Sequence, residues 1–321
     1  MSCDERSREW FSYYAVVSDS GLNGSENDSR FGGWWPERAG ITKNMLAVDI
    51  HVHPSTRGVD PQACAYFKRD PKDLPKSEEG LAELFVRQKA KGLLIGWHPS
   101  TVKEASPVTN EYVLGLTAKF PDAFAGVLAS LDMVGGDAAE RIGQAEELLR
   151  NPKVRGFKFH PPDQGFYPND RRHYGLWELL EGGKKPVMFH TGFTVLGAGS
   201  DGGGGIALDY GRPIHLDTLA RDFPGLKIIA AHPGWPWQEE LIGIVTHKRN
   251  IYVDTSGYLA DQLPEIFRRA IQGRLQDKAL FGTDFPYVDL GKALSSFEKL
   301  EMKESVKEKI LISNAKELFG I

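Results

Sequence analysis

Two histidines separated by one residue close a short apolar segment of the chain. Residues 47–54 read Ala-Val-Asp-Ile-His-Val-His-Pro, which places the pair at His51 and His53. In a β-strand, side chains two residues apart point to the same face, so both imidazoles would project together from the end of one strand. Such a pair suits a divalent metal ion, which takes nitrogen ligands at roughly 2.0–2.1 Å. The alternative is a strand with two ordinary polar histidines.

Residues of the same kind close other apolar segments. The chain has nine histidines, and five of them lie at the ends of such segments, which scatter would not readily produce. Imidazole and carboxylate groups are the usual ligands of catalytic Zn²⁺. The sequence therefore predicts a metal-dependent site assembled from several segment ends. The segments 154–160, 186–190 and 227–232 end in His160, His190 and His232, and the segment 279–284 ends in Asp284.

The segments that carry these residues alternate with stretches of helical spacing. Eight strands followed by eight helices are typical of a (β/α)8 TIM barrel, an α/β fold whose catalytic residues lie at the carboxyl ends of the strands. The predicted strands are 47–53, 92–97, 124–130, 154–160, 186–190, 227–232, 251–256 and 279–284. The predicted helices are 77–91, 109–120, 137–149, 173–180, 213–223, 237–247, 263–273 and 290–300.

Two stretches stand outside this alternation. Residues 1–44 are rich in small polar residues and show no sustained period, so we predict an irregular or partly disordered N-terminal extension before a barrel at 45–321. Met45 is a candidate alternative start, unless the aromatic residues of the extension pack on the barrel floor. Residues 54–76 are rich in proline and charge, which predicts a long functional or disordered loop.

Composition argues against several classes of protein. The net charge of −4 and the scattered Lys and Arg residues give no basic surface for nucleic acid or an anionic membrane. The chain lacks an apolar run of roughly 18 residues and an apolar N-terminal signal core, so we expect neither a transmembrane helix nor secretion. Cys3 and Cys64 build no disulfide framework, which fits a cytoplasmic location.

Four short motifs give the chain a family resemblance: 51–53 (His-Val-His), 190–192 (His-Thr-Gly), 232–234 (His-Pro-Gly) and 282–286 (Gly-Thr-Asp-Phe-Pro). In combination they resemble the amidohydrolase superfamily and its amidohydrolase-2 branch, to which aminocarboxymuconate-semialdehyde decarboxylase and γ-resorcylate decarboxylase belong. The resemblance covers residues 45–321 and implies a metallo-dependent hydrolase barrel that forms homo-oligomers. It also implies one divalent ion per chain, Zn²⁺ first and Mn²⁺ second. The implied ligands are His51, His53, His190 and Asp284, with His232 beside them as catalytic acid and base.

The chemistry of these residue types agrees with the implied site. Three neutral imidazoles and one carboxylate leave the ion with net positive charge, so it can polarise a substrate oxygen and lower the pKa of water toward ~7. His232 can exchange a proton near neutral pH, because the pKa of an unperturbed histidine is about 6.5. Asp284 can serve as a metal ligand, as a base, or in both roles.

Four further residues are candidate substrate contacts. Lys158 either binds a substrate carboxylate or, as a carboxylated lysine, bridges two metal ions as in other amidohydrolases. His160 either contacts the substrate or caps its strand. Arg57 could clamp a carboxylate with two parallel hydrogen bonds. Trp235 offers an aromatic wall for a flat substrate.

A second set of motifs indicates the reaction. Residues 165–170, the glycine run 202–205 and residues 232–237 resemble bacterial 4-hydroxyphenyl-β-ketoacyl-CoA hydrolases. That resemblance implies hydrolysis of a carbon–carbon bond in an aromatic β-ketoacyl compound, a small carbonyl or carboxylate substrate that could be a CoA thioester, in aromatic catabolism. The Pro-Gly-Trp-Pro sequence after His232 departs from the decarboxylases of the branch. Non-oxidative decarboxylation of an aromatic or muconate-like acid and a non-catalytic binding barrel are the alternatives.

Overall fold

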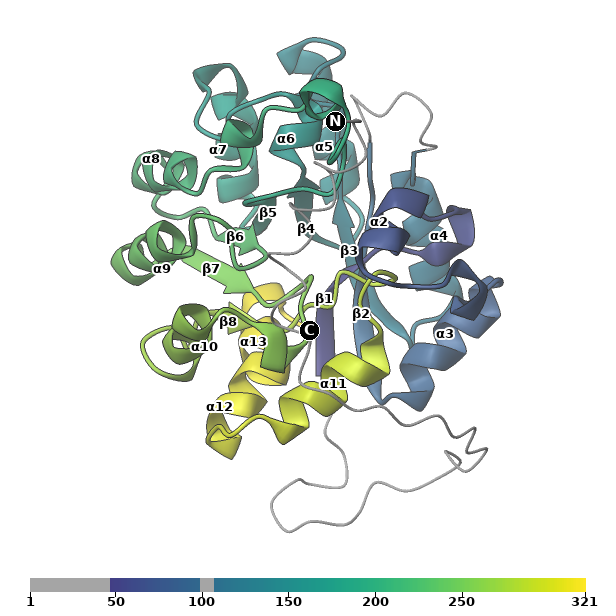
Figure 1. Ribbon diagram of the computed structural model, residues 1–321. Coiled ribbons are helices and arrows are strands. Elements are labelled where there is room, and N and C mark those ends of the chain that lie inside the picture. Colours follow the sequence, from purple (N-terminus) through teal and green to yellow (C-terminus); the bar gives the residue numbers. More distant parts are fainter. Residues whose placement is uncertain (1–46, 99–106) are drawn as a thin grey trace, which may run out of the picture. The chain divides into compact units, whose positions relative to one another are not determined.

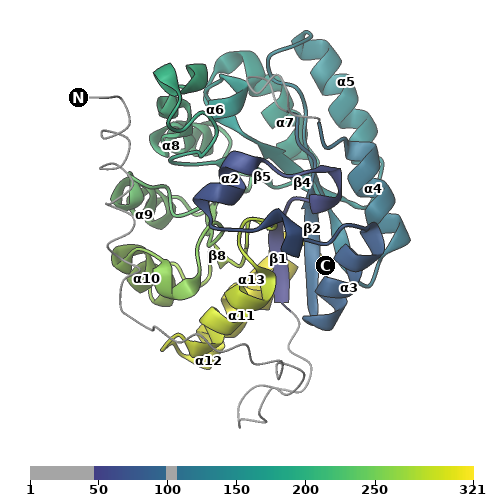
Figure 2. The same ribbon diagram turned by 45° about the vertical axis from the view of Figure 1, so that its right-hand side comes forward.

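Parallel strands surrounded by helices form the described part of the chain. The computed structural model describes residues 47–98 and 107–321, and the predicted extension at 1–44 lies outside them. Eight strands pair side by side in the order of the sequence, and the helices lie outside them (Figure 1). A second view shows the same ring of helices (Figure 2). The predicted TIM barrel is therefore confirmed. The strands are β1 (Ala47–Val52), β2 (Ala90–Ile95), β3 (Phe124–Ala129), β4 (Val154–Phe159), β5 (Val187–His190), β6 (Ile228–Ala231), β7 (Ile251–Asp254) and β8 (Ala279–Leu280).

The barrel closes between its last and first strands through irregular contacts. β8 has only two residues, so regular pairing along it ends early. Beyond β8, the backbone N–H of Ile50 donates to the carbonyl of Phe281 at 3.1 Å. Val52 and Phe285 then pair in an isolated parallel bridge. The segment after β8 is thereby held against β1.

Each predicted helix has a counterpart in the structure. The side chains of Ser77 and Asp137 cap two of these helices, because they accept the backbone N–H groups of Gly80 at 3.0 Å and Glu140 at 2.7 Å. None of the helices within 47–98 and 107–321 has the length and apolar character needed to cross a membrane. The observed helices that correspond to the predicted ones are α3 (Glu78–Arg87), α4 (Asn110–Lys119), α5 (Ala138–Leu149), α7 (Tyr174–Gly182), α8 (Ile214–Asp222), α9 (Gln238–His247), α10 (Glu265–Gln272) and α11 (Leu290–Lys299). Shorter helices are α2 (Pro61–Tyr66), α6 (Pro161–Gln164), α12 (Glu304–Glu308) and α13 (Asn314–Phe319), with a π-helical turn at Lys309–Ser313.

The prediction for the first helix is wrong at its carboxyl end. We predict a helix over 77–91, whereas α3 ends at Arg87 and β2 begins at Ala90. Lys89 adopts a left-handed φ of 52°, which ends the helical path and turns the chain into the strand.

The stretch 54–76 contains short helices and is not a featureless loop. Asp60 caps α2, and Pro61 occupies its first position, where a proline costs no hydrogen bond. The side-chain amide of Gln62 donates to the carbonyl of Ala198, in the loop after β5. α2 therefore reaches from the loop after β1 to the loop after β5.

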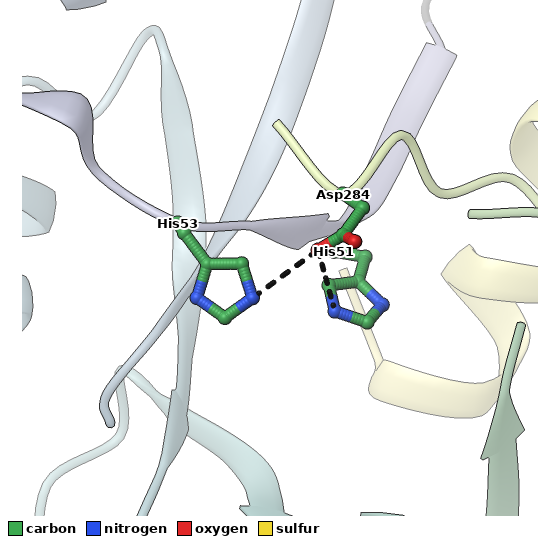
Figure 3. A group of neighbouring side chains, drawn as sticks. All are labelled: His51, His53 and Asp284. Carbon is green, nitrogen blue, oxygen red and sulfur yellow. Dashed lines mark ion pairs between the residues drawn. The ribbon is translucent and has the colours of Figure 1, made fainter. Parts of the chain in front are cut away.

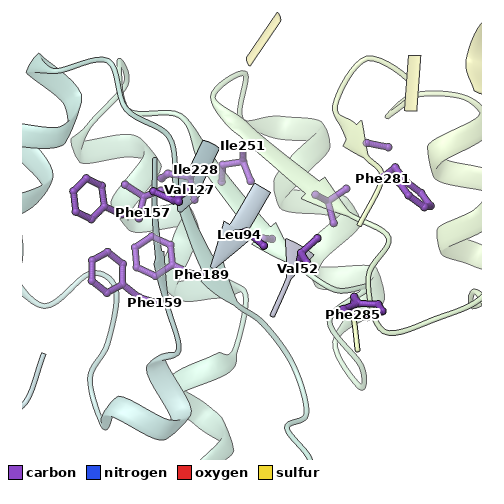
Figure 4. Packing of buried hydrophobic residues seen from close by; sticks show 14 of the residues in the cluster. Val52, Leu94, Val127, Phe157, Phe159, Phe189, Ile228, Ile251, Phe281 and Phe285 are labelled. Atoms are coloured by element: carbon purple, nitrogen blue, oxygen red, sulfur yellow. The ribbon is translucent and has the colours of Figure 1, made fainter. Parts of the chain in front are cut away.

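Apolar side chains pack in two layers, because successive strand residues point to opposite faces of the sheet. One layer lies between the strands and the helices and includes Phe157, Phe159 and Phe189 (Figure 4). The other fills the barrel interior, where Val48 of β1 packs in one cluster with Phe319 of α13. These layers fix the strands, and the strands fix the positions of the residues at their carboxyl ends.

Candidate metal centre

His51 and His53 converge on Asp284 at the carboxyl ends of the strands. His51 lies near the end of β1 and His53 directly after it, and the aspartate comes from the segment after β8 (Figure 3). The Nε2 atoms of His51 and His53 each lie 3.4 Å from Oδ1 of Asp284. The side chain of His51 is 1% exposed, whereas those of His53 and Asp284 are 24% and 14% exposed. The two imidazoles thus project together, as the sequence predicts.

The spacing of these three side chains fits a divalent ion. Two ligand atoms about 2.1 Å from one ion in tetrahedral geometry lie roughly 3.4 Å apart. That is the separation of both nitrogen–oxygen pairs. Within the part of the chain that the structure describes, His51, His53 and Asp284 form one of two groups whose potential ligand atoms all lie within 4.8 Å of one another. The residues present therefore suit a metal ion of the Zn²⁺ or Mn²⁺ type.

A buried carboxylate decides which nitrogen of His51 is free for a metal. Nδ1 of His51 lies 2.9 Å from Oδ2 of Asp254, and a carboxylate only accepts, so Nδ1 carries the hydrogen. Nε2 then holds the lone pair and faces Asp284. Burial alone would raise the pKa of Asp254, but His51 and the other neighbours outweigh it and hold this pKa below its usual range. Metal-binding histidines commonly donate their second N–H to a carboxylate in this way.

Asp254 also belongs to the second group of potential ligands, with His51 and His232. In that group the polar atoms already satisfy one another. Asp254 accepts the backbone N–H of His232 at 2.7 Å and the hydroxyl of Ser256 at 2.6 Å. A metal ion there would have to displace the hydrogen bond between His51 and Asp254, so we assign this group an orienting role. The sequence prediction missed Asp254 and Ser256, although both lie at the end of a predicted strand, where barrel enzymes carry their chemistry.

His190 and His232 form a pair beside the three potential ligands. Nδ1 of His190 lies 3.1 Å from Nε2 of His232. The carbonyl of Phe193 accepts from Nε2 of His190 at 3.1 Å, so Nδ1 of His190 keeps its lone pair. The hydroxyl of Ser256 donates to Asp254, and it therefore accepts from Nδ1 of His232 at 2.8 Å. Two lone pairs then face each other, an arrangement that a cation between the rings would stabilise.

His190 thus lies with His232 rather than within the group of His51, His53 and Asp284. His160 stacks on His190 with ring centroids 3.9 Å apart. Burial is the main cause that lowers the pKa of His160 and His190 well below the usual value, and neighbouring basic groups lower both further. Burial also lowers the pKa of His232. These imidazoles are therefore neutral near pH 7 in the metal-free chain.

Lys158 brings a buried amino group to the same place. Its Nζ lies 3.5 Å from Nε2 of His51. Burial lowers the pKa of Lys158 to about 8, although Asp254 and Asp284 act to raise it. A metal ion on Nε2 of His51 would compete with the ammonium for one lone pair. An anionic group between them would stabilise both cations.

Two residues of the site adopt a backbone conformation that non-glycine residues rarely take. The φ angle is 71° at His232 and 65° at Asp284. Such left-handed residues cost roughly 1–3 kcal/mol each and persist where the surroundings enforce them, which is common at functional sites. For Asp284, burial would raise the pKa, but His51 and His53 hold it below the usual range. The carboxylate is therefore ionised and available to a cation.

Arg57 and Trp235 are the two remaining predicted substrate contacts. Arg57 ends the short 3-10 helix Ser55–Arg57, and its side chain lies outside what the structure describes. Trp235 is exposed, and its ring packs edge-on against Phe193 with centroids 5.4 Å apart. Phe193 in turn contacts the ring of Tyr66, on α2, at 5.9 Å. These three residues form an aromatic wall from the loop after β6 to α2.

Comparisons with known proteins match the chain to one family and to several solved barrels. The amidohydrolase-2 family model, described as amidohydrolase, matches residues 48–321. A solved TIM-barrel protein of uncharacterised function from Bordetella bronchiseptica is 25% identical, with a TM-score of 0.73 over 86% of this chain and 99% of that one. A dihydroxybenzoic acid decarboxylase from Polaromonas sp. JS666, with bound manganese and the inhibitor 2-nitroresorcinol, is 19% identical, with a TM-score of 0.63 over 86% and 96%. A 5-carboxyvanillate decarboxylase from Sphingomonas paucimobilis is 16% identical, with a TM-score of 0.59 over 87% and 99%. None of the curated proteins matches the chain.

Proposed function

The chain belongs to the amidohydrolase family, and we propose that it is a metal-dependent hydrolase that cleaves a carbon–carbon bond beside a carbonyl group of an aromatic-derived substrate. Membership of the family makes it a metal-dependent enzyme, and the reaction is the proposal. The position of His232 is the observation that supports the proposed reaction. This residue lies next to the potential ligands with its Nε2 3.1 Å from His190, while Ser256 engages its Nδ1. It is therefore oriented to move a proton at Nε2.

We propose that His51, His53 and Asp284 hold one divalent ion, Zn²⁺ first and Mn²⁺ second, and that His190 adds its Nδ1. The hydrogen bond from Nε2 of His190 to the carbonyl of Phe193 supports this choice of nitrogen. The manganese in the dihydroxybenzoic acid decarboxylase supports a divalent ion in a barrel of this kind. When bound, the ion supplies Lewis acidity and lowers the pKa of water. A carboxylated Lys158 that bridges two ions is the alternative arrangement.

The residues around this position supply the remaining functions. Lys158 binds the keto oxygen of the substrate as negative charge develops on it, and His160, which reaches Thr194 at 3.4 Å, lines the same side. Trp235, with the rest of the aromatic wall, holds the flat ring of the substrate. We propose that Arg57 binds a carboxylate of the substrate.

The proton balance follows from His232. An aryl 3-oxoacyl compound and one water give an aromatic acid and an acetyl compound, the acyl group being carried as a thioester such as a CoA ester. The bond between the keto carbon and the methylene carbon breaks, and the oxygen of water ends in the aromatic carboxylate. His232 accepts a proton from water and returns it to the methylene carbon, which becomes a methyl group.

Non-oxidative decarboxylation is the second candidate. The solved decarboxylases of dihydroxybenzoic and 5-carboxyvanillic acids share this barrel. Lys158 would bind the carboxylate of such an acid equally well, and this reaction also ends with transfer of a proton to carbon. The two reactions differ in the fate of water, which is consumed only in the hydrolysis.

The test uses the full chain with its metal content measured. An aryl 3-oxopropanoyl thioester and a set of dihydroxybenzoates are incubated in H₂¹⁸O. We expect aromatic acid with one ¹⁸O atom and an acetyl thioester, and no CO₂. Release of CO₂ from a dihydroxybenzoate would instead favour decarboxylation. Inactivity toward both classes, with about one metal ion per chain, would overturn both assignments.

A variant at His232 separates proton transfer from metal binding. His232→Asn should retain the metal and lose roughly 10²–10⁴-fold in kcat, because general acid–base catalysis contributes that much. Loss of the metal in this variant would show that His232 is a ligand instead.

A further inference from the structure

Asp49 is a fully buried acid that the proposed chemistry does not use. It lies on β1, two residues before His51. Its carboxylate accepts three hydrogen bonds. Oδ1 accepts the backbone N–H groups of His51 and Thr283, each at 3.0 Å, and Oδ2 accepts the hydroxyl of Thr283 at 2.6 Å. A carboxylate is an acceptor-only group, so it suits three donors that converge on it.

These hydrogen bonds join the two segments that carry the potential metal ligands. Asp49 shares β1 with His51, and Thr283 directly precedes Asp284. Because β8 has only two residues, the regular ladder stops before it reaches this position. Oδ1 of Asp49 receives the N–H of Thr283, which a neighbouring strand would receive in a longer sheet. The side chain of Asp49 thus replaces a missing part of the ladder.

Thr283 passes the constraint on to Asp284. Its hydroxyl donates to Asp49 and accepts the backbone N–H of Phe285 at 2.9 Å. The backbone N–H of Asp284 donates to the carbonyl of His51 at 3.0 Å. The residues on both sides of Asp284 are therefore fixed, and so is its left-handed φ of 65°. Without these bonds the strained backbone would relax and carry the carboxylate away.

The packing of Gly282 agrees with a tightly held segment. A Cβ atom at this position would come within 3.0 Å of the Cβ of His51 and 3.2 Å of the Cβ of Ser256. The backbone after β8 therefore lies so close to β1 that a side chain at residue 282 would require its neighbours to shift.

We propose that Asp49 is a positioning residue that acts through Thr283. Together they form a clamp that sets the distance from Oδ1 of Asp284 to the Nε2 atoms of His51 and His53, and thereby the affinity of the site for its metal ion. This inference rests on the proposed metal site. Asp49 and Thr283 act on the ion only indirectly, because neither offers an atom to it.

The test compares two variants of Thr283. Thr283→Val keeps the shape of the side chain and removes the hydroxyl, whereas Thr283→Ser keeps the hydroxyl and is the matched control. The dissociation constant for Zn²⁺ is measured by competition with a chelator, and the fraction of folded chain is measured by circular dichroism. We expect Thr283→Val to bind Zn²⁺ 10–100-fold more weakly, the usual effect of losing a group that orients a ligand, as an order of magnitude. Thr283→Ser should stay within roughly threefold of the unchanged protein.

Asp49→Asn gives a second test that does not depend on the folding of Thr283→Val. Its amide nitrogen would face the hydroxyl of Thr283, which then loses the acceptor for its hydrogen, so Zn²⁺ affinity should fall by a similar factor. Folded variants that bind Zn²⁺ as tightly as the unchanged protein would overturn the proposal. A lower melting temperature with unchanged Zn²⁺ affinity would do the same, because the role would then be structural only. Absence of Zn²⁺ and Mn²⁺ binding in the unchanged protein would instead overturn the proposed function.

Discussion

The two sides of the barrel mouth differ in the groups that their basic side chains contact. On the β8–β1 side, the imidazoles of His51 and His53 meet carboxylates, at Asp254 and Asp284. On the β4–β6 side, basic side chains contact imidazoles, a hydroxyl or a carbonyl. The first side is prepared for a cation, and the second gains stability from an anion. We therefore infer that the metal ion lies toward the first side, with His190 as its one ligand from the second, and that an anionic group of the substrate lies toward the second side. The basic residues of the second side are Lys158, His160, His190 and His232.

Removal of the anionic charge at Asp284 should have the largest effect. We expect Asp284→Asn to lose its metal and to lower turnover on the order of 10³-fold or more, since the ion contributes several kcal/mol to the transition state. Metal content per chain and turnover are measured together. Asp122→Asn, an exposed position just before β3, is the matched control. Full metal content in Asp284→Asn would show that the β8–β1 side does not depend on this carboxylate.

Removal of the positive charge at Lys158 should affect the substrate instead. We expect Lys158→Met to keep its metal and to lower kcat/KM roughly 10–100-fold, because a hydrogen bond to a charged group contributes about 1.5–3 kcal/mol. Lys91→Met, at the amino end of β2, is the control for loss of a lysine. Loss of the metal in Lys158→Met would move Lys158 to the metal side of the comparison, as the carboxylated form requires.

In the metal-free protein, the imidazoles and the carboxylates should affect stability over different ranges of pH. Burial lowers the pKa of His51 to about 3 and those of His160 and His190 well below the usual value. The unfolded chain therefore binds protons that the folded chain refuses, and stability falls as the pH drops below ~6.5. The pKa values of Asp254 and Asp284 are lowered, so their contribution to stability is lost only as the pH drops below ~3.9.

This prediction is checked by urea unfolding between pH 7 and pH 5. Each buried histidine contributes a slope of up to about 1.4 kcal/mol per pH unit. His160→Gln should reduce the total slope by the contribution of one histidine, and it leaves every proposed metal ligand in place. An unchanged slope would contradict the neutral state that we assign to His160.

The potential ligands could be predicted because simple rules fix their places. His51 and His53 are two residues apart in a strand, and the carboxyl ends of parallel strands meet at one face. Asp284 follows from the same rule. The alternation of strands and helices could likewise be counted, whereas the short helix α2 could not, because Pro61–Tyr66 spans less than two turns and shows no clear period.

The residues that hold these ligands could not be singled out from the sequence. An acid at the end of a strand reads the same whether it binds a metal or accepts a hydrogen bond from a ligand. Asp254 differs from Asp284 in its distances to other atoms, which depend on the closed barrel, and Asp49 lies within β1 rather than at its end. The approach of Lys158 to His51 depends on packing in the same way.

The filled interior of the barrel has a kinetic consequence. Phe319 and Ala315 of α13 pack with Val48 of β1 and Leu280 of β8, so in the part of the chain described this cluster closes the barrel interior beneath the site. If the reaction yields two products, neither can leave through this interior, and we expect one to leave the mouth before the other. The product that departs last occupies the place of the next substrate, so it competes with substrate during turnover. The product that departs first does not. The order of release can thus be read from the pattern of product inhibition.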